Sequence, residues 1–467
     1  MITEDELKEV SGEIATAPDN GLGELYDRLV AMLNAEPDDH RIRFLFATVA
    51  CRARHHGVAK AILEPMLRSH GNWGALRVNY GMTLDGLGDM QGALHQYRHA
   101  VSDPRVDKAN LHSNRATALI KLGQYEEADQ ACVEALKVDP NHKEASMTRG
   151  FSRIALGDLG PGWDLYEKAV GTKHRISTDY GVPQWAGEIR ARVIVHGEQG
   201  LGDEIMYASC IADIADRCDA VAVDCDSRIS KLLRRSFFNL PNVTVYGSRS
   251  AKDRPWVADF KPTHSMGIGS LPKHFRRAPA DFPRRTYLCA DGPMTTMYRA
   301  LVSGVHLERS EHTPDQIIGI AWSGGTVETK EKLREIPVEA FAPLIKKYPR
   351  AAFVSLQYRE DAQAQIAESG LPIQHHVWAT GKGASYEHTA AMIAACDRVI
   401  ATDTTVIHAA GAMGVPTDCL LSTPCMWGHG PWQNDKSAWY PSVRLLRRPV
   451  DHDWARYIVH LASQSIL

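Results

Sequence analysis

The sequence lacks several features that would place the protein in a special class. It has no apolar run of membrane-spanning length, and its acidic N-terminus, Met-Ile-Thr-Glu-Asp-Glu-Leu-Lys, contains no apolar core of signal-peptide length. Its nine cysteines form no CxxC pair, and their odd number argues against a disulfide framework. We therefore expect a cytoplasmic protein without a structural metal.

A surplus of charge of one sign is also absent. The 53 Lys and Arg residues nearly balance the 56 Asp and Glu residues, which leaves a formal net charge of -3. This balance gives no electrostatic reason to expect nucleic acid or a membrane surface as a partner. With 467 residues, 44% of them hydrophobic, the chain is long enough for about three globular domains.

The first third of the chain contains an internal repeat. Glycines at 88, 123 and 157 are spaced by 35 and then 34 residues, and a small residue follows each glycine at the same distance. This is the tetratricopeptide period, in which small residues let the two helices of a hairpin pack closely. We predict a weaker copy from Phe44 to Leu67, with Ala61 at the small position, and a capping helix from Leu22 to Leu33.

Stacked repeats of this kind form a concave groove that commonly holds a peptide or protein segment. The simpler alternative is an array that only dimerises the protein or supports the next domain. We favour recognition of a protein partner, although the repeat architecture does not specify which one.

A glycine-rich turn between a strand and a helix begins the second part of the chain. The strand is expected at 191–196, followed by Gly-Glu-Gln-Gly-Leu-Gly-Asp-Glu and a helix to about Arg217. Asp203 falls near the helix start, where an aspartate usually only caps the helix. The functional alternative is a general base, kept ionised by the helix dipole and therefore a weaker base.

Two further charged motifs have ordinary interpretations. Asp224-Cys225-Asp226 matches the DxD motif of metal-dependent sugar transfer, but 220–224 has the pattern of a core strand, and Asp226 is expected to cap the next helix. The basic residues between Lys273 and Arg285 are typical of a solvated surface.

A second α/β unit is predicted from Gln316. Its first strand, 317–321, leads into Trp-Ser-Gly-Gly and a polar loop with Lys330, Lys332 and Arg334. Backbone N–H groups at Ser323 and Gly324, together with Arg334, suit a diphosphate without a metal. The later elements are expected as strands at 352–356, 373–377, 416–422 and 443–446 and helices at 338–348, 362–369, 386–396 and from 453.

The stretch from Asp397 to Gly414 is the strongest candidate for a ligand site. A strand at 399–401, a turn at 403–405 and a helix at 406–413 would place free N–H groups at the carboxyl end of a strand, where α/β sheets bind phosphates. Thr404 and Thr405 add hydroxyls, and His408 lies one turn further on. An ordinary capping turn with a core histidine is the alternative.

Several motifs, in this order, resemble those of bacterial tetratricopeptide-repeat glycosyltransferases, relatives of the lipopolysaccharide heptosyltransferases and more distantly of O-linked N-acetylglucosamine transferases. The motifs are GEQGLGD at 197–203, IAWSG at 320–324, REIP at 334–337, VSLQ at 354–357, DTT through HAAG at 403–411, and WYP at 439–441. The resemblance implies a GT-B fold, a nucleotide-sugar donor held by the C-terminal half, inversion at the anomeric carbon, and no metal or other cofactor.

The resemblance also assigns roles to residues of this chain. Asp203 matches the aspartate thought to act as the base, and the residues expected at the donor are Ser323, Gly324, Arg334, Asp403, Thr404, Thr405 and His408. Residues expected in loops near the site are Gln199, Gly200, Gly202, Gln357 and Trp427. Two departures concern the donor sugar: the usual Asp-Thr-Gly is Asp-Thr-Thr here, and the segment from Cys425 to His429 differs.

The predicted fold is α + α/β, with a repeat domain at 1–175 and a GT-B pair of Rossmann-like halves at 176–312 and 313–467. The predicted function is sugar transfer to Ser or Thr of a protein selected by the repeats, such as flagellin or another bacterial surface protein glycosylated before export. A non-catalytic repeat scaffold with a degenerate transferase half is the main alternative, and an enzyme that epimerises a nucleotide sugar is a third.

Overall fold

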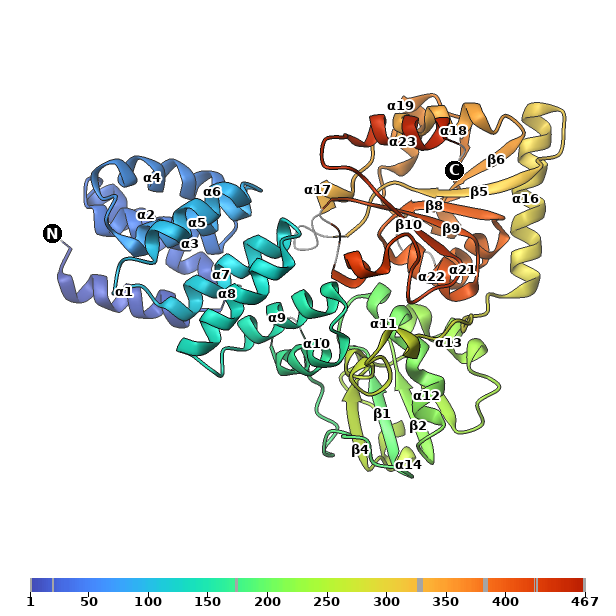
Figure 1. Cartoon of the computed structure of the whole chain (residues 1–467), viewed down its shortest axis with the longest axis horizontal. Helices are drawn as coiled ribbons and strands as arrows, with labels where there is room; N and C mark the ends of the chain where they lie inside the picture. Colours follow the sequence, from blue (N-terminus) through green and yellow to red (C-terminus); the bar gives the residue numbers. More distant parts are fainter. Residues whose placement is uncertain are drawn as a thin grey trace. The chain divides into compact units, whose positions relative to one another are not determined.

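A computed structural model describes residues 2–18, 21–172, 175–325, 331–380, 385–423, 425 and 427–464. The chain forms two compact units, Met1–Arg153 and Ile154–Leu467. Figure 1 shows a first unit built from helices and a second that contains the sheets. The fold is therefore α + α/β, as predicted. None of the helices in the described residues is long and apolar enough to cross a membrane.

The first unit consists of antiparallel helical hairpins around two adjoining apolar cores. Its helices are α1 (Glu4–Thr16), α2 (Leu22–Ala35), α3 (His40–Arg52), α4 (His56–Ser69), α5 (Gly74–Gly86), α6 (Met90–Ala100), α7 (Lys108–Lys121), α8 (Tyr125–Val138) and α9 (Lys143–Leu156), whose last three residues are assigned to the second unit. The sequence analysis did not include α1, although Thr3 and Glu6 form a capping box and Leu7, Val10 and Ile14 follow at helical spacing.

The hairpin turns explain the repeated glycines. Gly88, Gly123 and Gly157 all have positive φ angles, of 89°, 73° and 88°, which glycine adopts without a Cβ penalty. In the weaker copy Arg54 takes this position with a φ of 64°. Ala59, five residues later, is the buried small residue, whereas Ala61 is exposed, so the predicted position of the small residue was wrong.

The N-terminal half of the second unit is a four-stranded parallel sheet of order β3-β2-β1-β4. Its strands are β1 (Arg192–His196), β2 (Ala220–Asp224), β3 (Val243–Tyr246) and β4 (His264–Gly267), which the sequence analysis did not include. Its helices are α10 (Leu159–Tyr166), α11 (Leu201–Tyr207), α12 (Ile211–Ala215), α13 (Ser230–Ser236), α14 (Trp256–Phe260) and α15 (Pro272–Phe275).

The C-terminal half has a six-stranded parallel sheet of order β10-β9-β8-β5-β6-β7. The strands are β5 (Gln316–Ala321), β6 (Ala351–Ser355), β7 (Ile373–Gln374), β8 (Arg398–Thr402), β9 (Thr417–Leu421) and β10 (Val443–Arg447). The helices are α16 (Gly292–Ser310), α17 (Glu331–Arg334), α18 (Ala342–Lys347), α19 (Ala362–Ser369), α20 (Val377–Thr380), α21 (Tyr386–Ala395), α22 (Thr405–Met413) and α23 (Trp454–Ser463).

Helices cover both faces of this sheet (Figure 1). Side chains of α18, α19 and α23 share one apolar core with the central strands, while α16, α21 and α22 pack on the strands and on one another. Because both faces are covered, the strands are nearly continuous apolar runs, which the sequence shows clearly. Only the strand predicted at 373–377 is much shorter, since β7 ends at Gln374 and α20 begins at Val377.

The strand orders place a switch point in each sheet. In the C-terminal half β5 has β8 on one side and β6 on the other; in the N-terminal half β1 lies between β4 and β2. Ligands of open α/β sheets bind at the carboxyl ends of strands beside such a point. The loops that follow β1 and β4 in one half, and β5 and β8 in the other, are therefore the places to search for a site.

The observed units divide the chain differently from the predicted domains. Helix α10 belongs to the second unit, which begins at Ile154 rather than 176. Helix α16 lies before the predicted boundary at 313, yet it packs on α21, β5 and β6 of the C-terminal half. The C-terminal sheet domain therefore includes α16.

Candidate active site

The loop after β1 positions Asp203. The chain leaves β1 at His196, turns through 197–200 and enters α11, where Asp203 is the third residue. The backbone N–H of Gly200 donates to Asp203 Oδ2 at 3.1 Å. Asp203 thus closes the first turn of the helix with one carboxylate oxygen.

The environment of Asp203 changes its acidity. Burial raises the pKa of Asp203 to about 6; the Gly200 N–H opposes this rise, and the Asp403 and Glu198 carboxylates add to it. The sequence analysis expected the helix dipole to keep this carboxylate a weak base. That expectation was wrong, because burial and the two neighbouring carboxylates outweigh the stabilisation at the helix start. A pKa near 6 suits a general base at neutral pH.

Gly202 is where the two halves of the second unit approach each other. A Cβ atom at Gly202 would lie 3.0 Å from His408 Cδ2 and 3.5 Å from Thr405 Oγ1. Helices α11 and α22 are packed against each other at this point. The glycine therefore lets the Asp203 loop approach the start of α22.

Helix α22 presents its N-terminus at this meeting point. Thr404 is the N-cap, so the helix begins one residue earlier than the predicted 406, and Thr404 is 7% exposed. No side chain caps the helix among the described residues, and within the same residues the buried Thr404 hydroxyl has no hydrogen-bond partner. The Ile407 N–H is bonded to the Thr404 carbonyl, so the candidate anion site consists of the remaining start of the helix and the unpartnered Thr404 hydroxyl.

Asp403 organises the side chains around the start of α22. His429 Nε2 lies 3.3 Å from Asp403 Oδ1, and His408 Nδ1 is 2.9 Å from the Tyr440 hydroxyl. Burial alone would raise the pKa of Asp403, but His429, His408 and Arg334 hold it well below its usual range. Burial lowers the pKa of His408 to about 4, so this imidazole is neutral at pH 7.

The loop after β5 is fixed by Gln357, which follows β6. Backbone N–H groups of Trp322 and Ser323 both donate to Gln357 Oε1 at 3.2 Å, and Gln357 Nε2 donates to Ser323 Oγ at 3.0 Å. A Cβ atom at Gly324 would lie 2.6 Å from Thr404 Cγ2. Ser323, Gly324 and Gln357 are therefore part of the same loop cluster as Thr404, although the Ser323 N–H is already bonded to protein.

Arg334 reaches the cluster from α17. Its Nη1 atom donates to the Asp403 carbonyl oxygen at 2.6 Å, and the residue is 7% exposed. It therefore fixes the Asp403 turn and brings a positive charge beside α22. Lys330 lies outside the described residues, as does the side chain of Lys332, so their predicted role stays a prediction.

An aromatic cluster from α10 borders the Asp203 loop and was not predicted as part of the site. The Tyr166 hydroxyl accepts a hydrogen bond from Gln199 Nε2. The centroid of the Trp427 ring lies 5.8 Å from that of the Tyr166 ring and 6.0 Å from that of the Trp163 ring. The Trp427 ring therefore belongs to this aromatic cluster, and its predicted place in a loop near the donor stays a prediction. In the sequence, the only signal that α10 contacts the Asp203 loop is the presence of aromatic residues in the last repeat.

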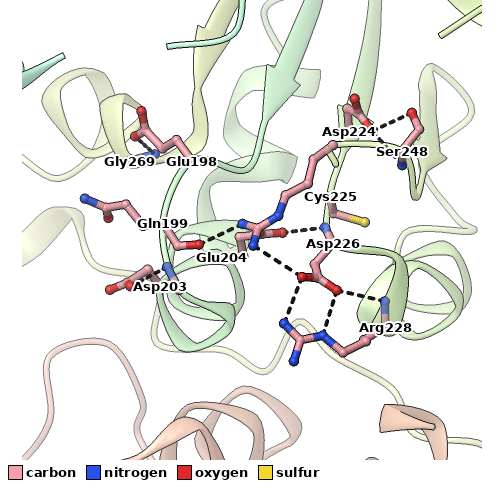
Figure 2. Close-up of polar contacts among 12 residues, drawn as sticks. Glu198, Gln199, Asp203, Glu204, Asp224, Cys225, Asp226, Arg228, Ser248 and Gly269 are labelled. Atoms are coloured by element: carbon pink, nitrogen blue, oxygen red, sulfur yellow. Dashed lines mark hydrogen bonds and ion pairs between the residues drawn. The ribbon is translucent and has the colours of Figure 1, made fainter. Parts of the chain in front are cut away.

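The DxD motif is occupied by structural contacts. Asp224 accepts from Tyr180, Ser248 and Arg254, while Asp226 accepts from the backbone N–H of Arg228. Figure 2 shows Asp224 bonded to Ser248. It also shows Asp226 between Glu204 and Arg228. Asp203 lies on the opposite side of Glu204 from Asp226. The capping role predicted for Asp226 is confirmed.

A mixed group of residues near α22 has spacings that could fit a cation. Single ligand atoms of Asp403, Cys419 and His429 lie within 4.8 Å of one another. Burial raises the pKa of the Cys419 thiol well above its usual value, and a thiol must lose its proton to bind metal. The guanidinium groups of Arg334 and Arg447 near these residues also oppose a cation. These charges disfavour a cation, and the contact that the group makes is the pairing of His429 with Asp403.

Comparison with known proteins supports the repeats directly. The tetratricopeptide repeat family profile matches residues 109–142, which cover α7 and α8. The α7–α8 hairpin is thus a tetratricopeptide repeat, within a helical array of the same kind. Protein FlbA of Caulobacter vibrioides is 25% identical over 438 residues, covering 88% of this chain and 70% of FlbA. A DnaJ homolog subfamily C member 7 homolog of Dictyostelium discoideum is 34% identical over 82 residues, 17% of this chain and 15% of that protein.

Two solved structures align with about a third of this chain at low TM-scores. TTC0263, a thermophilic TPR protein of Thermus thermophilus, is 17% identical and covers 36% of this chain and 91% of its own, with a TM-score of 0.31. PilF of Pseudomonas aeruginosa is 14% identical, covers 36% of this chain and 76% of its own, and has a TM-score of 0.32.

Proposed function

We propose that the chain is a metal-independent, inverting glycosyltransferase that moves a sugar from a nucleotide-sugar donor to a protein acceptor. The observation that carries this proposal is the approach of α11 to α22. It places a carboxylate with a pKa of about 6 near a helix N-terminus with a buried, unpartnered hydroxyl. The N-terminal half of the second unit supplies the base, and the C-terminal half supplies the anion site. Displacement of a diphosphate by a hydroxyl requires both groups.

The proposed reaction is a direct displacement. Asp203 takes the proton from a Ser or Thr hydroxyl while the hydroxyl oxygen bonds to the anomeric carbon of the donor. The bond from that carbon to the diphosphate oxygen breaks, and its electron pair leaves with the diphosphate. The N-terminus of α22, the Thr404 and Thr405 hydroxyls and the Arg334 charge would stabilise the leaving group.

The tetratricopeptide repeats support a protein acceptor, because such arrays generally bind peptides or proteins. We propose that they select the acceptor, and that flagellin or another surface protein remains one class of acceptor to test. A cytoplasmic location is part of the same proposal, since nucleotide sugars and unexported acceptors would meet there.

Nucleotide release provides the test. The purified chain is incubated with UDP-, GDP-, ADP- and CMP-linked sugars and candidate acceptors, and the released nucleotide and the mass of the acceptor are measured together. We expect one donor class to give equal amounts of nucleotide and glycosylated acceptor, both lost in Asp203→Asn. Modified nucleotide sugar without any acceptor would instead support epimerisation, and binding of a protein partner without binding of any donor would support the scaffold alternative.

A further inference from the structure

A cavity lies at the carboxyl edge of the four-stranded sheet, beside Glu198 in the loop after β1. Residues of the connector, the segment 167–191 between α10 and β1, line it on one side, and the ends of β1 and β4 line it on the other. Its volume is about 190 Å³. Figure 2 shows Glu198 directed toward Gly269, on the opposite side of Gln199 from Asp203.

Glu198 gives the cavity a buried carboxylate. Its side chain is 1% exposed, and its Oε1 atom accepts from Arg175 Nη2 at 2.7 Å and from the Gly269 N–H at 3.1 Å. Its Oε2 atom is buried and has no hydrogen-bond partner among the described residues. A Cβ atom at Gly267, which lines the cavity, would lie 2.3 Å from Oε2. The unpartnered oxygen therefore lies at the cavity wall.

The charges around Glu198 do not balance. Arg175 is shared, since its Nη1 atom also lies 3.3 Å from Glu167 Oε2, so one guanidinium faces two carboxylates. Asp179 adds a further carboxylate to the cavity lining, on the exposed connector. The described residues that line the cavity thus include two carboxyl groups and no Lys or Arg, although burial raises the pKa of Glu198 against the opposing effect of Arg175.

His196 does not offset this charge. The residue is 3% exposed and lines the cavity, and its Nδ1 atom has no hydrogen-bond partner within the described ranges. Burial lowers the pKa of His196 to about 4, although the Gly197 backbone and Asp224 oppose this shift. The imidazole is neutral at pH 7, so Nδ1 can accept a hydrogen bond when the proton is on Nε2.

We propose that this cavity binds a cationic amine, an alkylammonium group of the kind that a lysine side chain carries. Such a group donates three hydrogen bonds, and the cavity offers acceptors at Glu198 Oε2, His196 Nδ1 and Asp179. A phosphate or carboxylate would meet the like charge of Asp179 and Glu198, so the cavity disfavours the donor's diphosphate. The proposal does not depend on sugar transfer.

Saturation-transfer NMR on the full-length chain tests this inference. The probe is Nα-acetyl-lysine methylamide, and the control probes are the norleucine analogue, which lacks only the ammonium group, and the glutamate analogue. We expect saturable binding of the lysine probe only, weakened at high salt. Equal binding of the norleucine probe, or binding of none of the three, would overturn the proposal.

Variants locate the binding. Glu198→Gln keeps the shape and removes the charge, and we expect it to weaken binding of the lysine probe at least tenfold. Asp179→Asn, on the exposed connector where folding is not at risk, should weaken it severalfold. Glu308→Gln, an exposed carboxylate on α16, should change nothing. The proposed site would be contradicted if Asp179→Asn binds the lysine probe as tightly as the wild type and Glu198→Gln does the same. It would also be contradicted if Asp179→Asn binds normally and Glu198→Gln misfolds.

Discussion

Asp203 combines two roles at the scale of single residues. It completes the first turn of α11 through the Gly200 N–H, and its raised pKa leaves it ionised above about pH 6. A carboxylate used only as a cap would be expected to have a lowered pKa, since an N–H at a helix start favours the charged form. Burial and the Asp403 and Glu198 carboxylates reverse that direction here.

The first prediction concerns the pH dependence of transfer. The base must be ionised, so kcat/KM should fall with decreasing pH through about 6, rather than through the usual aspartate value near 4. Asp203→Asn should reduce transfer by about 10²–10⁴-fold and leave donor affinity within about twofold. Rates measured from pH 4.5 to 8 check this, and an acidic limb near pH 4, or normal turnover in the variant, would rule out Asp203 as the base.

Sequence patterns identified some residues of the site and not others. Ser323, Gln357 and Thr404 each come two residues after a strand, and Asp203 comes just after the turn that follows β1, so local order along the chain places them near the edges of the sheets. Tyr166 and His429 reach the site from α10 and from the loop after β9, and their positions depend on tertiary packing. No spacing along the sequence specifies that Tyr166 bonds to Gln199.

At the scale of elements, small residues let α22 pack closely. A Cβ atom at Gly411 would lie 2.4 Å from Tyr440 Cγ, and Tyr440 in turn bonds to His408. The absence of a side chain at Gly411 therefore lets the Tyr440 ring pack against α22 and hold the helix in place. This explains why the stretch from 403 to 411 ends in Ala-Ala-Gly.

The second prediction compares two glycine substitutions. Gly411→Ala should lower the free energy of unfolding by about 1–3 kcal/mol, because the new methyl group overlaps the Tyr440 ring. Gly304→Ala, in α16 with nothing within 4 Å of its Cβ position, should raise it by about 0.5–1 kcal/mol. Urea denaturation of both variants measures the difference. Equal effects would contradict the packing of α22 on Tyr440.

Most elements were predictable from the sequence, for physical reasons. Strands such as β5 and β8 are buried on both faces, so their apolar runs are continuous. Strand β4, His-Ser-Met-Gly, lacks such a run and pairs with β1 on one side, and it was missed. Helix α16 was also missed, although Asp291 caps it and Pro293 follows at its start.

At the scale of the whole molecule, α10 joins the last repeat to the second unit. Trp163 is almost fully buried there, and its Nε1 atom donates to the Arg276 carbonyl oxygen at 2.9 Å. Its ring also lies 6.4 Å from the Tyr207 and Trp439 rings, centroid to centroid. The repeat period extends through 157–169, so the sequence placed α10 with the array, while its packing places it with the sheets.

The third prediction concerns where the chain can be divided. A fragment of residues 154–467 keeps α10 and should unfold cooperatively, whereas a fragment of residues 176–467 loses Trp163 and Tyr166. Loss of a buried tryptophan alone costs about 3–5 kcal/mol, so the shorter fragment should be much less stable or insoluble. Thermal unfolding of the two fragments decides, and equal melting temperatures would show that α10 is dispensable to the second unit.

Binding of a nucleotide-sugar donor is the measurement that tests the central claim most directly. Titration calorimetry of the full chain with UDP-, GDP-, ADP- and CMP-sugars should identify one nucleotide class. Thr404→Val, which removes only the buried hydroxyl, should weaken that binding about tenfold or more, whereas Thr296→Val on the exposed face of α16 should not. Binding of no donor, or equal binding by the wild type and Thr404→Val, would contradict a donor site at the start of α22.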